Sequence, residues 1–331
     1  MKNDKEMTIG DVLKVSSAYW QSSTIHCGVK LDVFSHIGDH GATAKEVADK
    51  AKADERAVSM LLNALTALGL VYKNAELYSN SPLSREYLIK GKPAYSGYII
   101  MHHYHLVDAW TQLDEAVRSG GAVEKRSYGV EQERESFLMG MYNIAMGIAP
   151  IIAQQIKLEN RRHLLDLGGG PGTHAVFFCR ENPDLKATIF DRPTTRDFAE
   201  KVVEHHGMVD RIRFMAGDFT KDQVGGPYDI AWLSQILHSN GPADCRKIIE
   251  RTVAALEPGG LIMVHEFFLD ETKTKPLFPA LFSLNMLVNN GHGSSYSEQE
   301  IVEMLHAAGI GKIDRLSFQG PNDSYIICGT R

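Results

Sequence analysis

The sequence has few cysteines, and they do not form a metal-binding or disulfide pattern. Four cysteines are spread over 331 residues, and none belongs to a Cys-x-x-Cys pair. Isolated cysteines exclude the common zinc-binding classes and the small disulfide scaffolds of secreted proteins. They are typical of a reducing compartment, so we expect a cytoplasmic location and no metal site.

Long hydrophobic runs and an excess of positive charge are missing as well. Residues 1–8 are polar and charged, which predicts no signal peptide, and no run reaches the ~18 apolar residues of a membrane span. The 41 Asp and Glu residues outnumber the 35 Lys and Arg residues, which gives a net charge of −6. A protein of this charge is not expected to bind nucleic acid or an acidic membrane surface. The length suggests about two domains.

The first part of the chain is predicted to be helical. Residues 18–37 carry apolar side chains at helical spacing. Thr43 and Glu46 form a capping box that opens a short helix. The next helix begins after Asp54 and stops at Gly69.

A small hairpin is expected to follow these helices. Residues 70–73 and 76–79 are short strand-like runs around a tight turn, and two helices followed by a hairpin form the winged-helix pattern. Many winged helices bind DNA. Here, however, Arg56 is the one basic residue in the helix 54–68 that would enter the groove. We therefore expect a packing or dimerisation module.

Residues 80–157 look mainly helical and are rich in aromatic residues, histidine and methionine. His102, His103 and His105 lie close together but lack the i, i+4 spacing of a helical zinc site. We expect these histidines to line a pocket or to be partly exposed.

From residue 162 onward, strand-like runs alternate with helices, which predicts βαβ units and a parallel sheet with helices on both faces. A helix from Ser297 to Ala308 opens with a second capping box, formed by Ser297 and Glu300. Two final strands should form a hairpin that adds antiparallel strands to the sheet edge. The expected strands are 163–167, 186–190, 212–216, 228–233, 261–267, 313–317 and 325–329.

A glycine-rich turn is the sharpest local signal. The strand ending at Leu167 runs into Gly168, Gly169 and Gly170, and a helix follows. Glycines allow the backbone to bend tightly and to approach a ligand closely. The NAD and FAD folds share such turns, so this signal alone does not identify the ligand.

Acidic residues follow the next two strands. Asp191 ends the second strand, where a carboxylate suits the ribose hydroxyls of an adenosine. Asp218 and Phe219 follow the third strand. There the Asp218 carboxylate could accept a hydrogen bond from the adenine amino group, and Phe219 could pack on the adenine ring. Asp166 before the glycine turn favours S-adenosylmethionine over a dinucleotide, because a strand-end acid can hold the amino-acid part of that donor. The sequence 257–260, Glu-Pro-Gly-Gly, before a strand is typical of class I methyltransferases.

With these motifs, the chain resembles the plant-type O-methyltransferases (caffeic acid, isoflavone and acetylserotonin O-methyltransferases) and their bacterial polyketide-tailoring relatives. The resemblance covers nearly the whole sequence. It implies a Rossmann-like class I methyltransferase sheet with an antiparallel C-terminal hairpin, preceded by a mainly helical winged-helix dimerisation domain. The implied divisions are 1–100 for dimerisation, 101–157 as a helical linker that lines the substrate, and 158–331 for S-adenosylmethionine binding.

The resemblance also implies the chemistry. His238, in the run Ile236-Leu237-His238, matches the family's catalytic histidine, and Glu266 matches the acidic residue that orients it. A histidine can take the proton of a phenol as the methyl group is transferred, leaving S-adenosylhomocysteine as the product. A homodimer that methylates a hydroxylated aromatic small molecule is expected.

The resemblance assigns further residues to binding. The donor-binding set is Asp166, Gly168, Gly169, Gly170, Asp191, Asp218, Phe219 and Ser234. The substrate-binding set, a plastic apolar slot for flat rings, is Tyr142, Met146, Met286 and Asn290.

Three departures from the family pattern keep other activities open. Residues 239–241, Ser-Asn-Gly, replace an acidic-aromatic pair, Ser234 replaces a lysine, and Ser295 falls where a second glutamate is usual. One carboxylate that supports the histidine is therefore missing. Methylation of carbon, or donor binding without methyl transfer in a regulatory role, remain alternatives. A nicotinamide-dependent oxidoreductase would leave the N-terminal module and the His238–Glu266 pair unexplained.

Overall fold

The computed structural model describes residues 6–331, which form two compact units. The first unit runs to His105 and includes Glu131–Asn143, and the second comprises Leu106–Val130 and Ile144–Arg331. The predicted divisions at residues 100 and 157 stay a prediction, and both units share the helical middle segment. The polar start of the chain, which predicts no signal peptide, lies partly in residues 1–5, outside the described residues.

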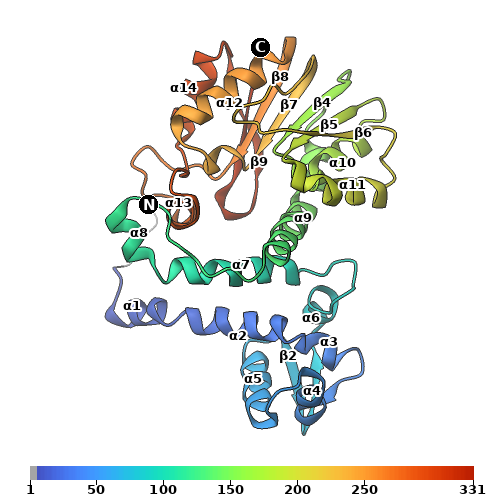
Figure 1. Cartoon of the computed structure of the whole chain (residues 1–331), viewed down its shortest axis with the longest axis vertical. Helices are drawn as coiled ribbons and strands as arrows, with labels where there is room; N and C mark the ends of the chain where they lie inside the picture. Colours follow the sequence, from blue (N-terminus) through green and yellow to red (C-terminus); the bar gives the residue numbers. More distant parts are fainter. Residues whose placement is uncertain (1–5) are drawn as a thin grey trace. The chain divides into compact units, whose positions relative to one another are not determined.

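The first unit is helical, with one small antiparallel sheet in the order β1-β3-β2. The predicted order of two helices and a hairpin is confirmed (Figure 1). The hairpin strands begin one residue later than expected. Its elements are α1 (Ile9–Ser16), α2 (Tyr19–Lys30), α3 (Val33–Ile37), β1 (Ala42–Thr43), α4 (Ala44–Ala51), α5 (Glu55–Ala67), β2 (Val71–Asn74), β3 (Leu77–Asn80) and α6 (Pro82–Tyr87).

Local hydrogen bonds explain where these helices begin. Thr43 and Glu46 form the predicted capping box of α4, and the Asp54 side chain accepts from the Ala57 N–H at 2.9 Å. The single helix expected over 18–37 is instead two helices. Asp32 adopts a left-handed conformation with φ 52°, which no sequence period reveals, and so α2 ends before it.

Three helices connect the two units in sequence, namely α7 (Gly97–Trp110), α8 (Leu113–Ser119) and α9 (Val130–Gln155). In residues 6–331, α9 is the one helix long and apolar enough to cross a membrane by length and composition alone. The most apolar 18-residue stretch of α9 is 39% buried. Pro150 lies inside the helix. Core helices of soluble proteins meet the same criterion.

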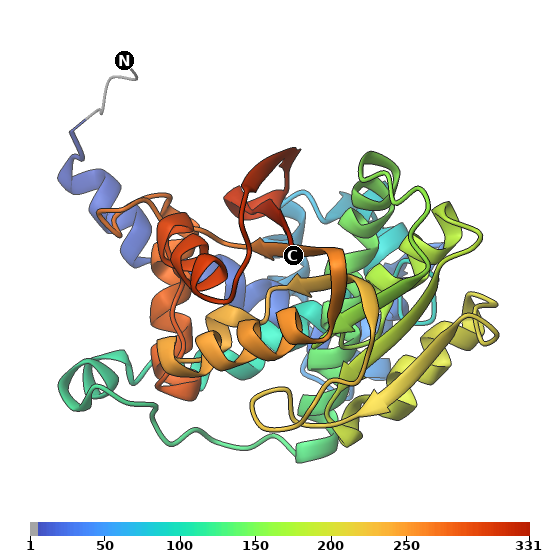
Figure 2. The same ribbon diagram turned by 90° about the horizontal axis from the view of Figure 1, so that it is seen from above.

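The second unit is built on a seven-stranded sheet in the order β6-β5-β4-β7-β8-β10-β9. All neighbours are parallel except β10, which is antiparallel to β8 and β9, so the predicted C-terminal hairpin is confirmed. Figure 2 shows this hairpin in dark red beside the orange strand β8. The strands are β4 (His163–Leu167), β5 (Lys186–Asp191), β6 (Ile212–Ala216), β7 (Tyr228–Ser234), β8 (Leu256–Glu266), β9 (Ile313–Gln319) and β10 (Tyr325–Thr330).

Helices cover both faces of this sheet, as expected for buried parallel strands (Figure 1). Helices α12 and α14 pack on one face over a core that includes Leu165, Leu233 and Ile249. On the other face α10 lies against β4 and β5, and α11 lies against β6. The helices are α10 (Thr173–Glu181), α11 (Arg196–His205), α12 (Pro242–Ala254), α13 (Leu277–Asn290) and α14 (Glu298–Ala307).

Strand β8 begins five residues earlier than the sequence suggests. Leu256 pairs with Tyr228, and the next pair joins Ile230 to Leu261, so residues 257–260 form an irregular bulge inside the strand. Gly259 has φ 79°, and a Cβ at Gly260 would lie 2.8 Å from a backbone oxygen. The two glycines therefore permit a bulge just before residue 261, where the strand was expected to begin.

Candidate active site

The carboxyl ends of the parallel strands bring most of the predicted donor residues to one edge of the sheet. Leu167 at the end of β4 lies between Phe190 of β5 and Leu233 of β7. The glycine turn therefore emerges between Asp191 and Ser234, the last residues of the two neighbouring strands. This edge is where open α/β sheets bind ligands.

The glycine turn lies directly over the Asp166 carboxylate. Gly168 and Gly170 have φ of 65° and 54°, which favours glycine at both positions. A Cβ at Gly169 would lie 2.6 Å from the Asp166 carboxyl carbon, so a larger residue there would collide with the acid. Backbone conformation therefore favours glycine at positions 168 and 170, and lack of space favours it at position 169.

Asp166 is a buried acid with an unsatisfied oxygen. It is 1% exposed, and its Oδ2 has no hydrogen-bond partner in the described part of the chain. Burial raises its pKa to about 7, although a hydrogen bond from the Ala175 backbone acts in the opposite direction. A buried carboxylate with an oxygen that lacks a hydrogen-bond partner is suited to receive a cationic group from a ligand.

Asp191 fixes the other side of the turn. Its Oδ2 accepts from the Gly170 N–H at 2.8 Å, and its Oδ1 accepts from the Arg192 N–H at 2.6 Å. Burial nevertheless raises the pKa of this carboxyl, because it outweighs those two bonds. The acid that was predicted for the ribose therefore also holds the glycine turn.

Asp218 and Phe219 are mainly engaged within the protein. The Asp218 Oδ1 accepts from the backbone N–H and the hydroxyl of Thr220 at 2.9 and 2.6 Å, which lowers its pKa. Phe219 belongs to the sheet core and is 6% exposed. Their contact with an adenine stays a prediction.

His238 and Glu266 form a buried pair. The His238 Nδ1 lies 2.7 Å from the Glu266 Oε2. The other carboxylate oxygen, Oε1, accepts from the Leu237 N–H at 2.9 Å. Glu266 therefore holds both the imidazole ring and the short 3-10 helix Leu237–Ser239 that carries it.

Aromatic rings surround the His238 imidazole. Phe282 meets it edge-on at 4.8 Å between ring centroids, and Phe267 lies nearly parallel at 6.1 Å. Phe278 stacks on Phe282, four residues along α13. These rings were missed by the sequence analysis, although the i, i+4 phenylalanines on one helix were a visible signal.

Asn290, predicted to bind substrate, bonds to the backbone around His238. Its Nδ2 donates to the Ser239 carbonyl at 3.2 Å, and its Oδ1 accepts from the Gly293 N–H at 2.8 Å. The Tyr296 hydroxyl donates to the Asn240 carbonyl. Two side chains from outside this loop thus clamp it.

The remaining predicted substrate residues are spread over two helices. Met286 is largely buried on α13, four residues before Asn290. Tyr142 and Met146 lie one helical turn apart on α9, Tyr142 in the first unit and Met146 in the second. Their roles stay predictions.

Ser295, where the resemblance predicts a second glutamate, is a buried serine. It is 1% exposed, and its Oγ has no partner among residues 6–331. Its N–H donates to the Ser283 hydroxyl at 3.1 Å. Glu266 is therefore the carboxylate that the structure places on His238.

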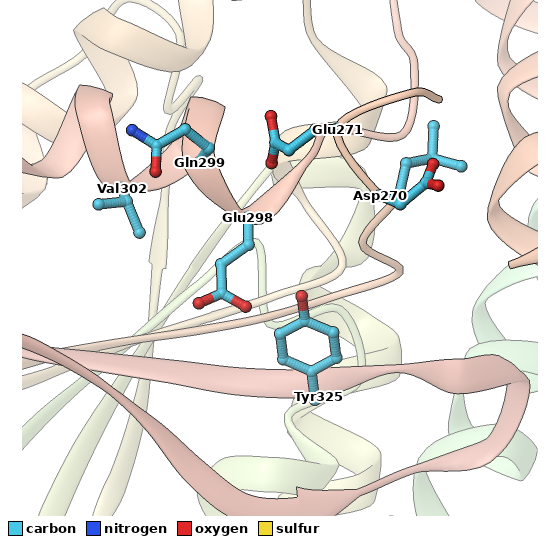
Figure 3. A pocket seen from close by; sticks show the side chains of 7 residues that line it. Asp270, Glu271, Glu298, Gln299, Val302 and Tyr325 are labelled. Atoms are coloured by element: carbon cyan, nitrogen blue, oxygen red, sulfur yellow. The ribbon is translucent and has the colours of Figure 1, made fainter. Parts of the chain in front are cut away.

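A separate cavity of about 390 Å³ lies beside the start of β10 (Figure 3). Figure 3 shows the Glu298 carboxylate and the Tyr325 hydroxyl pointing toward one another. The cavity contains none of the predicted site residues, its lining being Leu269, Asp270, Glu271, Glu298, Gln299, Val302 and Tyr325. Across residues 6–331, no three His, Cys, Asp or Glu side chains are grouped to hold a metal ion.

Comparison with known proteins identifies the family. The O-methyltransferase domain matches residues 110–311, and the O-methyltransferase dimerisation domain matches residues 13–90. The 3-hydroxy-5-methyl-1-naphthoate 3-O-methyltransferase of Streptomyces sahachiroi is 29% identical over 324 residues, which cover 96% of this chain and 94% of that protein. The tetracenomycin polyketide synthesis 8-O-methyl transferase TcmO of Streptomyces glaucescens is 30% identical, with 95% and 94% covered.

A solved structure agrees along nearly the full length of both chains. PigF with S-adenosylhomocysteine superposes with a TM-score of 0.89 at 25% identity, covering 98% of this chain and 100% of that one. The chain belongs to the O-methyltransferase family and is an S-adenosylmethionine-dependent methyltransferase that carries the family's dimerisation domain.

Proposed function

We propose that this enzyme methylates a hydroxyl group of an aromatic or polycyclic small molecule, with His238 as the general base and Glu266 as the residue that orients it. The observation that carries the proposal is the buried 2.7 Å contact between His238 Nδ1 and Glu266 Oε2. It lies at the carboxyl end of β8, beside the strand that ends at Ser234.

The residues of the glycine turn fit the methyl donor. The unpartnered Oδ2 of Asp166 among the described residues is suited to the donor's ammonium group, and Asp191 is suited to the ribose hydroxyls. Gly168–Gly170 leave the space above Asp166 free of side chains. The bound donor supplies an electrophilic methyl group on a sulfonium.

His238 is set up to remove a proton from the acceptor. A carboxylate at Nδ1 favours the tautomer with its proton on that nitrogen, which leaves the Nε2 lone pair free. Phenols have a pKa near ~10 and are mostly protonated at neutral pH, so a base is needed as the oxygen attacks. Glu266 then stabilises the imidazolium that forms.

The surroundings of His238 favour a flat acceptor. Phe267, Phe278 and Phe282 present aromatic surface next to the imidazole, and aromatic rings pack well on such surface. The two relatives named for a naphthoate and for tetracenomycin support an aromatic polyketide as the acceptor class. The dimerisation domain supports a homodimer as the working form.

A binding experiment paired with one variant tests the proposal. Wild type and His238→Ala should bind S-adenosylhomocysteine equally in calorimetry, with NAD as the comparison ligand that does not bind. Methyl transfer to a panel of hydroxylated naphthoates should fall by about 10²–10⁴-fold in the variant.

Different failures have different meanings. Well-folded wild type that does not bind S-adenosylhomocysteine would overturn the donor assignment. Equal turnover by wild type and His238→Ala would overturn the base and leave proximity as the source of catalysis. Donor binding with methyl transfer to carbon would overturn the hydroxyl acceptor.

A further inference from the structure

A chain of three polar side chains leads from the core of the second unit to the edge of the donor site. The Ser324 Oγ lies 3.1 Å from the His265 Nε2, and the His265 Nδ1 lies 3.0 Å from the Ser234 Oγ. Ser324 and His265 are 1% and 0% exposed, whereas Ser234 is partly exposed. Ser234 is therefore the end of the chain that can reach a ligand.

The middle of this chain is an uncharged imidazole. His265 stacks on Trp232 with 5.8 Å between centroids, and Phe318 meets it edge-on. Burial lowers the pKa of His265 to about 4 and that of the neighbouring His174 to about 3. At neutral pH the His265 ring has one N–H donor and one acceptor nitrogen.

The two possible directions of the chain are not equivalent. If His265 donated from Nε2 to Ser324, the buried Ser324 hydroxyl proton would have no acceptor within residues 6–331. In the opposite direction every buried proton has an acceptor, which is the less costly arrangement.

We propose that His265 is a positioning residue for the methyl donor, fixed by Ser324 so that Ser234 presents its hydroxyl proton to the donor's carboxylate. In this arrangement Ser324 donates to Nε2, and Nδ1–H donates to the Ser234 Oγ. The Ser234 O–H is then free to donate outward. The inference rests on the proposed function, because it assumes the donor that the glycine turn would hold.

The position of Ser234 agrees with this role. Leu233 pairs with Leu167 across β7 and β4, so Ser234 lies level with Gly168 at the start of the glycine turn. Asp166, on the other side of that turn, is suited to the donor's ammonium group. An amino acid bound between them would have its two charged ends met by an acid and by a hydroxyl donor.

The test compares two ligands that differ in the amino-acid part. S-Adenosylhomocysteine has it, and 5′-methylthioadenosine keeps the adenosine without it. Ser234→Ala should weaken binding of S-adenosylhomocysteine about tenfold, and Ser324→Ala about fivefold. Neither variant should change the Kd of 5′-methylthioadenosine.

A double-mutant cycle tests whether Ser324 acts on the donor through His265 and Ser234 or independently of Ser234. If Ser324 acts through His265 and Ser234, adding Ser324→Ala to Ser234→Ala should weaken binding no further. Thr252→Val is the matched control, since Thr252 is a fully buried hydroxyl on α12 that bonds to the Ile248 carbonyl. It should leave both affinities unchanged. Ser324→Cys, which keeps the size and a weak donor, replaces Ser324→Ala if that variant unfolds.

The outcomes distinguish this inference from the proposed function. Additive effects in the cycle, or equal weakening of both ligands by Ser324→Ala, would overturn the inference while wild type still binds S-adenosylhomocysteine. Wild type that binds neither ligand would overturn the donor site itself, and with it the role of His265.

Discussion

At the residue scale, Glu266 has two tasks that its two oxygens divide. One oxygen faces the His238 ring and the other accepts from the Leu237 N–H, so the same carboxylate places the proposed base and favours one tautomer of its ring. Ser295, where the resemblance predicts a second glutamate, carries no carboxylate. The orientation of the His238 ring therefore depends on its contact with Glu266.

This dependence makes Glu266→Gln an informative change. The amide keeps the size and can still accept from the Leu237 N–H, but its NH₂ group would face Nδ1 and favour the tautomer with the proton on Nε2. We expect kcat to fall by about 10²–10⁴-fold while the Kd for S-adenosylhomocysteine stays unchanged. The measurement is single-turnover methyl transfer beside calorimetry. Unchanged kcat would show that Glu266 is a structural residue.

The Asp166 carboxylate is suited to bind the donor, but its burial destabilises the fold when no ligand is present. Because burial raises its pKa to about 7 from an ordinary value of 3.8, ionisation destabilises the ligand-free fold as pH rises between these two values. Asp166→Asn removes that cost. We expect the variant to be about 2–4 kcal/mol more stable than wild type at pH 8 and no more stable near pH 4.

The same variant should bind the donor poorly, because an amide cannot neutralise an ammonium group. Denaturant unfolding at pH 4 and pH 8, with calorimetry of S-adenosylhomocysteine at pH 8, measures both effects. A stability difference that does not change with pH would mean that the Asp166 carboxyl is already neutral or already paired throughout this range.

At the element scale, the sequence predicted those features that depend on short-range chemistry. Capping boxes at Thr43 and Ser297 mark the true starts of their helices, because a cap is a hydrogen bond between residues three apart. The parallel sheet and its antiparallel C-terminal hairpin were also predictable, since alternating strands and helices leave few possible topologies. The break at Asp32 was not, because no local pattern requires that residue to be left-handed.

The candidate site divides in the same way. The sequence motifs identify residues at strand ends, which the sheet then brings to one edge without further information. The clamp that Asn290 forms on Ser239, and the bond from Ser324 to His265, join residues about 50 and 60 positions apart. Such contacts depend on how α13 and the C-terminal hairpin pack, so no spacing rule could have predicted them.

At the scale of the whole molecule, the N-terminal helix exposes an apolar surface that a single chain leaves uncovered. None of the eight residues of α1 is buried among the described residues. Ile9 and Leu13 on this helix are 74% and 62% exposed, and Trp20 near the start of α2 is 65% exposed. Large exposed apolar side chains grouped on one segment mark an interaction surface. The dimerisation domain matched from residue 13 makes a second copy of the chain the expected partner.

A charge placed on this surface should therefore change the oligomeric state. Leu13→Glu would force a carboxylate into an apolar interface, which costs more than a homodimer of ordinary affinity can tolerate when it occurs twice by symmetry. Light scattering after size exclusion should show wild type at twice the chain mass and Leu13→Glu at the mass of one chain. Val209→Glu, on an equally exposed apolar residue of the second unit, should remain dimeric. A dimeric Leu13→Glu would place the interface elsewhere in the dimerisation domain, and a monomeric wild type would remove the homodimer altogether.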